Sequence, residues 1–589
     1  MDTQRYRERL VTLLATDGFA PEPRGERPDP LAALVRGDGD EWYFSDVDYT
    51  DRSTASWEVL AHTRRLCEAL RFDGLERFRL DAERRCRVLG ALSFFLRRHF
   101  HNDNWWYNEI GLPLDVSALT LLLEEYMSED DRREALALIA QGGYEAERAR
   151  FDKWSGANML WIATVGLRLA VLTGDEVAFA ALAERIRREF ATDGAEGIRD
   201  DGSFFQHGPR LYTGGYGRSF VEQSASLFYL LDGTDYDLPP AAKEAYMDLL
   251  LEGVRGTSLA GVPDWHSVGR EMVRPGGLSS ASTVRALRVL ARVGGLPRRE
   301  EAEQFLRDIG SGADSENKTR YFPRTATLTA KADGRYIGVR CLAPGLMGAE
   351  QCNGEGVLCH HMTYGCNTCL MTSGREYVGM AGVYDYARIP GTTAVWEDDA
   401  SLCAKSPKND VWRGAWYGGA AEDGCGVICQ EQIHDGLTLK AAFFTVGDTL
   451  VALGCDLAGE VEGAVTTVDQ KIVDLPIGGP VRGERLMIGG VTYRGLDSTT
   501  LSASVEERRG SLSRNSVQLA PTDERRRVLT VTVAEAGAPY AYAVSLGDVL
   551  PITVESNTPA RMAIVAGGRR LSVTTDENGR AVCRVERVG

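Results

Sequence analysis

A glycine-rich stretch in the first half of the chain carries side chains that could move protons. Residues 201–217 read DGSFFQHGPRLYTGGYG and include His207, Arg210 and Tyr216. The glycine content argues against a helix here, and loops on rigid scaffolds often carry catalytic groups. An imidazole and a phenol nine positions apart could then meet at one substrate atom. A structural loop with a surface histidine and a packed tyrosine is the alternative interpretation.

Two arginines later in the same half are spaced for a common ligand. Arg270 and Arg274 are four positions apart, so they share a face if this stretch is helical. Guanidinium groups donate paired hydrogen bonds to carboxylates. A salt-bridged surface is the usual alternative, but the neighbours Trp265, Met272 and Val273 are apolar, which favours ligand binding.

Aromatic side chains form a third group of candidates. Asn104 precedes Trp105 and Trp106, and two consecutive tryptophans cannot both face one helical core. At least one of them is expected to line a surface cleft, where flat rings stack on sugar faces. Trp154 and Asn158 add another aromatic ring and an amide further along the chain.

A cysteine- and histidine-rich segment lies in the second half. Its potential metal ligands are Cys359, His360, His361, Cys366 and Cys369. Cys366 and Cys369 have the two-residue gap of zinc ligands, but no second such pair follows at the spacing of a zinc finger. We therefore expect buried thiols here, with no metal ion and no other cofactor.

The elements that must position these groups change type near the middle of the chain. Up to about residue 310, apolar residues recur every three or four positions, as in residues 157–170 and 283–292. This period predicts amphipathic helices joined by short loops. Residues 309–320 are polar and rich in glycine and serine, as in a linker. Beyond them the period becomes two, which is typical of strands.

Hairpin signals support an all-β second half. Residues 437–446 and 449–456 read as strands joined by Gly447-Asp448, and Gly567-Gly568 marks another tight turn. We predict helical hairpins packed as an irregular barrel, followed by stacked antiparallel sheets. The expected domains are 1–315, helical and catalytic; 316–500, a central β-sandwich; and 501–589, a small β domain.

The length, composition and net charge of the chain exclude some classes of function. A chain of 589 residues, 43% hydrophobic and 26% charged, has the composition of a globular protein with more than one domain. Its net charge of −17 argues against general binding to nucleic acid or anionic lipid, because such binding needs clustered lysines and arginines. No apolar run is expected to reach the length of a membrane span, and the first residues lack the pattern of a signal peptide.

Taken in order, these motifs resemble those of the polysaccharide lyase family that contains hyaluronate, chondroitin AC and xanthan lyases. The matching elements are Asn104-Trp-Trp with Glu109-Ile-Gly, Gly156-Ala-Asn158, Asp201-Gly-Ser-Phe with Gln206-His-Gly and Tyr212-Thr-Gly-Gly-Tyr-Gly217, Gly269-Arg with Arg274, Asn353-Gly-Glu355, and Pro390-Gly-Thr-Thr393. Several motifs in order are more specific than any one of them. The resemblance implies an α+β multidomain fold, with an N-terminal α/α toroid (an incomplete helical barrel) followed by antiparallel β-sandwich domains.

The same resemblance implies β-elimination on a uronic-acid-containing polysaccharide, with glycosaminoglycans of the hyaluronan or chondroitin type as the expected substrates. The reaction removes the C5 proton beside a neutralised carboxylate and protonates the departing O4. Asn158 would stabilise the developing enolate. Tyr216 would protonate O4, and either Tyr216 or His207 would be the base.

The resemblance also implies roles for charged and aromatic groups. Arg270 and Arg274 would bind acid groups and could lower the pKa of the phenol. Glu355 would orient an arginine or the tyrosine. The expected substrate-binding residues are Asn104, Trp105, Trp106, Trp154 and Arg210. Gly356 departs from the family, which usually has an asparagine after this glutamate.

Two other classes of function remain open from the sequence. A helical-barrel glycoside hydrolase needs two carboxylates, which Glu109 and Asp201 could supply. A catalytically inactive carbohydrate-binding protein would need the tryptophans but neither His207 nor Tyr216. We expect a monomer that binds an acidic polysaccharide and neither nucleic acid nor membrane. The resemblance implies an extracellular or periplasmic location, while the lack of a signal peptide leaves a cytoplasmic one open.

Overall fold

The computed structural model describes residues 2–20, 27–37, 41–53, 57–72, 74–142, 154–405, 411–459 and 461–588. The chain forms two compact units, and both are discontinuous in sequence. The first contains Met1–Gly197, Ser219–Met247 and Ala281–Arg299. The second contains Ile198–Arg218, Asp248–Ser280 and Glu300–Gly589.

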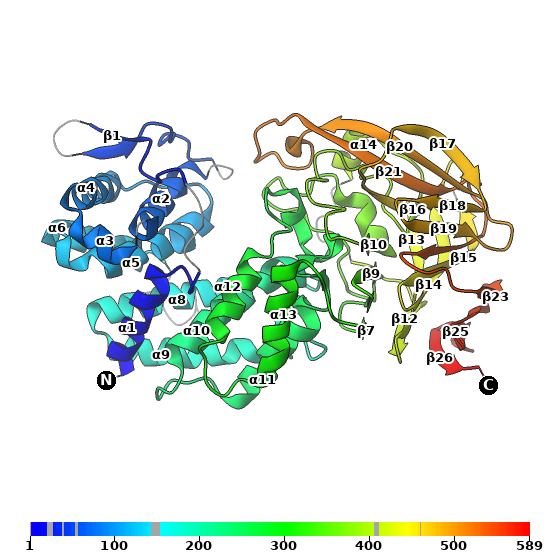
Figure 1. Cartoon of the computed structure of the whole chain (residues 1–589), viewed down its shortest axis with the longest axis horizontal. Helices are drawn as coiled ribbons and strands as arrows, with labels where there is room; N and C mark the ends of the chain where they lie inside the picture. The colour runs from blue at the N-terminus through cyan, green and yellow to red at the C-terminus, as the bar shows by residue number, and fades with distance from the viewer. Residues whose placement is uncertain are drawn as a thin grey trace. The chain divides into compact units, whose positions relative to one another are not determined.

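The first unit is helical, as predicted from the three- and four-residue spacing. Its helices, labelled in Figure 1, are α1 (Asp2–Ala15), α2 (Glu58–Phe72), α3 (Leu75–Leu80), α4 (Ala82–Arg98), α5 (Leu112–Leu123), α6 (Glu129–Ala140), α8 (Gly156–Thr173), α9 (Glu176–Arg187), α10 (Arg218–Leu231), α11 (Pro240–Asp248) and α12 (Ala281–Leu290). A short hairpin pairs β1 (Leu34–Arg36) with β2 (Trp42–Phe44). Asp81, Ser128 and Asp175 begin α4, α6 and α9 by accepting a backbone N–H three residues on.

Helix α8 is mostly apolar, and Arg168 is its one charged residue. By length and composition it could cross a membrane, and it is the one such helix among the residues described. The expectation that no apolar run reaches this length was therefore wrong. Its most apolar window is nevertheless 83% buried inside the protein. Because a helix surrounded by protein needs no polar face, α8 is a central core helix of the first unit.

The second unit is built on antiparallel sheets (Figure 1). A four-stranded sheet has the order β10 (Asn367–Met371), β9 (Arg335–Arg340), β8 (Thr327–Ala332), β7 (Lys318–Phe322). A seven-stranded sheet has the order β12 (Tyr417–Glu422), β13 (Cys425–His434), β14 (Leu437–Val446), β15 (Thr449–Gly459), β22 (Tyr540–Ser545), β19 (Val491–Gly495), β18 (Arg485–Ile488). A five-stranded sheet has the order β11 (Thr393–Ala394), β16 (Val465–Ile472), β21 (Glu524–Val533), β20 (Leu501–Gly510), β17 (Gly478–Gly483). The last sheet has the order β23 (Ile552–Thr558), β24 (Arg561–Ala566), β25 (Arg569–Thr575), β26 (Ala581–Arg587).

Buried side chains on both faces of the seven-stranded sheet make it the middle layer of a sandwich. Phe443 belongs to a core shared with residues of β8, β9, β20 and β21. The next residue, Phe444, belongs to a core shared with Ile564 and Leu571 of the C-terminal sheet. Neighbouring residues of a strand face opposite sides, so the apolar residues of β14 serve both cores.

The predicted hairpins are confirmed. β14 and β15 pair across Gly447 (φ 57°), and β24 and β25 pair across Gly567 (φ 56°) and Gly568 (φ 71°). Positive φ angles are what the tight turns of hairpins require, and glycine adopts them without a steric penalty.

Two segments from the first half of the sequence pack into the second unit. One is Ile198–Arg218, which contains β4 (Phe204–Phe205). The other is Asp248–Ser280, whose Trp265, Val268 and Met272 are buried in one cluster with side chains from the second half. These two segments carry the loop histidine, the tyrosine and both arginines singled out above.

Candidate active site

Tyr216 lies in a single π-helical turn, Thr213–Gly217, which continues into α10. The expectation that this stretch is not helical was wrong for these five residues. Its glycines allow close packing, because a Cβ on Gly215 would lie 2.4 Å from the ring of Tyr212, and one on Gly214 would lie 2.2 Å from Ser267 Oγ. π-Helical turns of this length often occur at functional sites.

The turn brings three rings together. The ring centroid of Tyr216 lies 4.7 Å from that of His207 and 5.0 Å from that of Tyr212, both in edge-to-face arrangement. His207 has a positive φ of 56°, which is uncommon for a residue with a side chain. The sequence prediction that the imidazole and the phenol come together is met by this geometry.

Glu350 holds two of these three residues. Its Oε1 lies 2.6 Å from Nδ1 of His207, and its Oε2 accepts a 2.5 Å hydrogen bond from the hydroxyl of Tyr212. An ionised carboxylate can only accept, so Nδ1 of His207 carries a proton, and in the neutral imidazole the lone pair is on Nε2. This orientation suits Nε2 to act as a proton acceptor.

The sequence analysis did not single out Glu350. Burial by itself would raise the pKa of this carboxyl group, but the charge of Arg270 and the hydrogen bond from His207 hold it well below its usual range. The backbone N–H of Arg270 also donates to Oε2 at 3.3 Å. The only sequence signal for Glu350 is that it lies five positions before Glu355, the glutamate of the Asn-Gly-Glu motif.

Glu355 contacts both Arg270 and Arg274. Arg270 lies in a 3-10 helix, Gly269–Val273, and Arg274 follows it in extended conformation. Arg274 donates two hydrogen bonds to Glu355, from Nε at 2.7 Å and from Nη2 at 2.6 Å, while Nε of Arg270 lies 3.1 Å from the same carboxylate. The sequence interpretation favoured a ligand carboxylate for these arginines, whereas in the structure both lie against Glu355 of the protein itself, and Arg274 remains partly exposed.

The pKa of Tyr216 differs from the sequence expectation. Burial raises it, Arg270 lowers it, Glu350 raises it further, and the net result lies above the usual value. The expected lowering by the arginines is present but does not offset burial. Tyr216 is consequently a neutral phenol at neutral pH, which suits a proton donor.

Arg210 is buried, and its contacts are internal. Its guanidinium donates to the carbonyl oxygen of Ala349 at 3.0 Å and contacts the sulfur of Met347 at 2.8 Å. These bonds tie the histidine loop to the segment that carries Glu350. This geometry favours a positioning role over the substrate contact expected from the sequence.

The aromatic candidates lie in the first unit. Trp105 is 37% exposed, and its ring stacks on that of Trp154 with centroids 4.3 Å apart. Trp106 is half-buried and packs edge-on against Trp161 at 5.7 Å. Asn104 Oδ1 accepts the backbone N–H of Trp106 at 3.1 Å. The exposed, stacked pair is thus Trp105 with Trp154, and Trp106 and Asn104 have structural contacts.

Asn158 is also in the first unit, in the first turn of α8, and is 4% exposed. Its Oδ1 is buried with no hydrogen-bond partner among the described residues. An unsatisfied buried amide oxygen is uncommon in proteins, which marks Asn158 as a functional candidate within its own unit.

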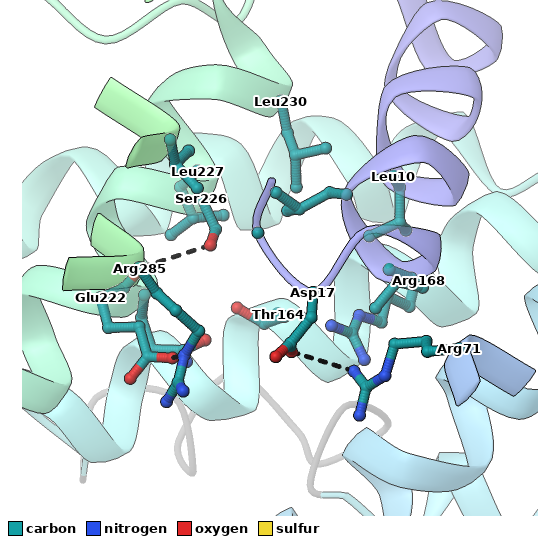
Figure 2. Close-up of a pocket in the computed structure, with 15 residues that line it drawn as sticks. Leu10, Asp17, Arg71, Thr164, Arg168, Glu222, Ser226, Leu227, Leu230 and Arg285 are labelled. Atoms are coloured by element: carbon teal, nitrogen blue, oxygen red, sulfur yellow. Dashed lines mark hydrogen bonds and ion pairs between the residues drawn. The ribbon is translucent and has the colours of Figure 1, made fainter. Parts of the chain in front are cut away.

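A cavity in the first unit, drawn in Figure 2, contains none of the predicted site residues. It lies among α1, α2, α8, α10 and α12. Its carboxylates are already paired, Asp17 with Arg71 at 3.1 Å and Glu222 with Arg285 at 2.6 Å. We therefore do not assign it to the active site.

The cysteine- and histidine-rich segment does not gather its cysteines around a common point. In the described part of the chain, no group of three potential metal ligands includes a cysteine. All twelve cysteines are free, and the sulfur of Cys366 lies 3.9 Å from that of Cys341, which precedes the segment. One ligand group does form, from His361, Glu397 and Asp435.

Comparison with known proteins gives a consistent picture. The chain matches the family description "Polysaccharide lyase family 8, N terminal alpha-helical domain" over residues 38–284, and "Polysaccharide lyase family 8, super-sandwich domain" over residues 317–550. It is 23% identical over 449 residues to a chondroitinase AC of Pedobacter heparinus, covering 74% of this chain and 62% of that protein. It is 25% identical over 424 residues to a hyaluronate lyase of Cutibacterium acnes, covering 63% and 51%. The chain thus spans less than two thirds of the length of these relatives.

The fold is shared with a solved chondroitinase AC lyase studied as oligosaccharide complexes. The TM-score is 0.82 at 19% identity, covering 98% of this chain and 88% of the other. Both the helical and the sandwich parts of the predicted fold are confirmed by this match.

Proposed function

Because the chain belongs to polysaccharide lyase family 8, we propose that it cleaves a uronic-acid-containing polysaccharide by β-elimination and leaves 4,5-unsaturated uronide ends. Glycosaminoglycans of the hyaluronan or chondroitin type are the substrates that its relatives' names support, since these are a chondroitinase AC and hyaluronate lyases.

The arrangement of His207, Glu350 and Tyr216 carries the proposal. Elimination needs a base for the proton at C5 and an acid for the departing O4. Glu350 fixes His207 with the lone pair on Nε2, and burial keeps Tyr216 protonated. In the proposed step, Nε2 takes the C5 proton, the C4–O4 bond breaks as the C4–C5 double bond forms, and the phenol protonates O4.

The uronate carboxylate must be neutralised for its neighbouring proton to become acidic. We assign this to the partly exposed guanidinium of Arg274. The family resemblance alone proposes Asn158 as a donor to the developing enolate. Arg270 is buried between Glu350 and Glu355 and holds both carboxylates in place. The stacked pair Trp105 and Trp154 supplies an apolar surface for a sugar ring.

A glycoside hydrolase would need two available carboxylates, and the structure gives it less support. Oδ1 of Asp201 accepts from the backbone and hydroxyl of Ser203, and Oδ2 accepts the backbone N–H of Arg324 at 2.8 Å. Its lone pairs are thus already used to shape the loop before His207.

An ultraviolet assay separates the three classes of function. A lyase product contains a double bond conjugated to the carboxylate and absorbs, a hydrolase product does not, and an inactive binder gives no product. We expect absorbance to rise on hyaluronan or chondroitin sulfate with wild-type protein and not with Tyr216→Phe. Release of reducing ends without absorbance would overturn the proposal.

We further propose that the protein acts as a monomer in the extracellular space or periplasm, on an acidic polysaccharide and without nucleic acid or membrane partners. The polymeric substrate supports this location, because such polymers do not cross membranes. Cell fractionation and light scattering on the purified chain test the two statements.

A further inference from the structure

Three titratable side chains distant in sequence meet in the second unit. His361 belongs to a 3-10 helix, Cys359–Tyr364; Glu397 precedes α14 (Asp399–Ala404); and Asp435 lies in the turn between β13 and β14. One potential ligand atom from each lies within 4.8 Å of the other two. The mechanism proposed above uses none of them.

His361 is fully buried between two oxygen acceptors. Its Nδ1 lies 3.3 Å from the carbonyl oxygen of Ala387, and its Nε2 lies 3.3 Å from Oε1 of Glu397. A neutral imidazole has one N–H, so it can satisfy only one of these oxygens, and its other nitrogen must direct a lone pair at an acceptor. A metal ion held between Nε2 and the carboxylate would remove this repulsion.

The orientation of the ring is the one that metal-binding histidines adopt. They usually donate the N–H of the second ring nitrogen to a backbone carbonyl or a carboxylate, which fixes the tautomer. With the proton on Nδ1 facing Ala387, Nε2 of His361 faces the two carboxylates. Two ligands bound tetrahedrally to zinc at 2.0–2.1 Å are about 3.3 Å apart, and Nε2 and Oε1 have this separation.

A cation already lies against the same carboxylates. Nζ of Lys405 is 2.7 Å from Oε1 of Glu397 and 3.0 Å from Oδ2 of Asp435. Both carboxylates are therefore paired with a cation of the protein itself. Lys405 would also compete with a metal ion, since both require the same oxygen atoms.

The surroundings offer a further ligand and a route of entry. Nε2 of His360 lies 3.7 Å from Oδ2 of Asp435, close enough to reach a shared ion after a small movement. Lys405, Glu397 and Asp435 line one cavity together with Tyr364. A hydrated ion could therefore arrive from this cavity, and the flexible lysine could withdraw into it.

We propose that His361, Glu397 and Asp435 bind one Zn²⁺ ion, with His360 as the fourth ligand and Lys405 displaced. Imidazole with carboxylate ligands suits zinc better than calcium or magnesium, which prefer oxygen alone. The ion would join the 3-10 helix, the segment before α14 and the β13–β14 turn. The site goes beyond the proposed lyase activity and does not depend on it.

The test uses the full chain, stripped of metal by chelation and titrated with Zn²⁺ in a calorimeter. We expect one ion per chain and a higher melting temperature in its presence. Asp435→Asn and Glu397→Gln, which keep side-chain size, should each weaken binding at least tenfold. Lys405→Met removes the competing charge and should tighten it. Asp399→Asn is the matched control, because Asp399 lies two positions after Glu397 but is ion-paired with Arg514 and is not in the cluster.

Free thiols are the main source of adventitious zinc binding, and Co²⁺ distinguishes them. Thiolate ligands produce a sulfur-to-cobalt charge-transfer band in the near ultraviolet, whereas nitrogen and oxygen ligands do not. The proposal is overturned by such a band, by zinc binding that persists in both Asp435→Asn and Glu397→Gln, or by no binding near one equivalent. Tighter binding in Lys405→Met would instead support competition for one site.

Discussion

Nδ1 of His207 lies 2.6 Å from Oε1 of Glu350, although 143 positions separate the two residues in the sequence. The other oxygen of the same carboxylate binds the hydroxyl of Tyr212, against whose ring Tyr216 packs. One buried carboxylate thus sets both the tautomer of the imidazole and the position of the phenol. This relationship resembles the way in which an acid orients the histidine of a serine protease triad.

Glu350→Gln should therefore impair turnover more than substrate binding. The amide keeps the shape of the side chain but has no charge and only one oxygen. It therefore cannot replace both carboxylate oxygens, one of which faces Nδ1 of His207 while the other accepts from the hydroxyl of Tyr212. We expect kcat to fall by about 10–10²-fold with KM changed less than about threefold, because the substrate contacts are preserved. Steady-state kinetics on the absorbing product measure this, and an unchanged kcat would contradict the orienting role.

Tyr216→Phe removes only the hydroxyl group, so the packing against His207 and Tyr212 should survive. We expect an unchanged melting temperature and a loss of about 10²–10⁴-fold in kcat. Tyr212→Phe is the matched control, since it loses a hydrogen bond to Glu350 but no proton donor, and its effect should be smaller. A folded Tyr216→Phe protein with near wild-type production of unsaturated uronide would refute the mechanism.

His207→Ala tests which group is the base. If Nε2 of His207 accepts the C5 proton, the variant should lose at least about 10²-fold in kcat, and added imidazole should restore part of it in a concentration-dependent way. The effect of added imidazole on the wild-type protein is measured in parallel as the control. A small loss without rescue would show that Tyr216 performs both proton transfers.

The charge on Glu350 should make stability depend on pH in the acid range. Its pKa is held below the usual value in the folded protein, while an unfolded glutamate titrates near 4.3. The unfolded state thus binds a proton more readily, so this group stabilises the fold above about pH 4.3 and the contribution is lost as the pH falls below it. Urea unfolding from pH 5 to pH 3 should show a flatter dependence in Glu350→Gln than in the wild type.

Trp105→Ala should affect saccharide binding, whereas Trp106→Ala should affect stability. Trp105 is exposed and stacked on Trp154, so its loss should weaken saccharide binding by about 1–3 kcal/mol without lowering the melting temperature. Trp106 packs against Trp161 and lies 2.8 Å from the position of a Cβ on Gly111, so its loss should lower stability. Calorimetric binding of an oligosaccharide and thermal melts give both quantities. Equal effects of the two substitutions on binding and melting would contradict this assignment.

Much of the fold is determined by interactions within a few residues, and these can be read from the sequence. The three- and four-residue spacing of apolar side chains predicts α8 and α12, and the turn residues Gly447 and Gly567 mark hairpins whose strands meet the turns at the expected residues. The candidate residue types are also visible in the sequence, but their roles come from the resemblance of several ordered motifs to one family, because the spacing alone leaves a structural loop and a salt-bridged pair open. His207 and Tyr216 are accordingly candidates that the sequence alone proposes.

What the sequence did not determine depends on contacts between residues far apart in the chain. No local pattern shows that Ile198–Arg218 and Asp248–Ser280 pack with the β-sheets, because their membership follows from burying Trp265 and its neighbours in a core completed by residues beyond 330. Glu350 is a single acid among many until folding places it, buried, between His207 and Arg270. Its low pKa and its partners exist only in that environment, since burial and neighbouring charges shift the pKa of an ionisable group from the value set by its residue type.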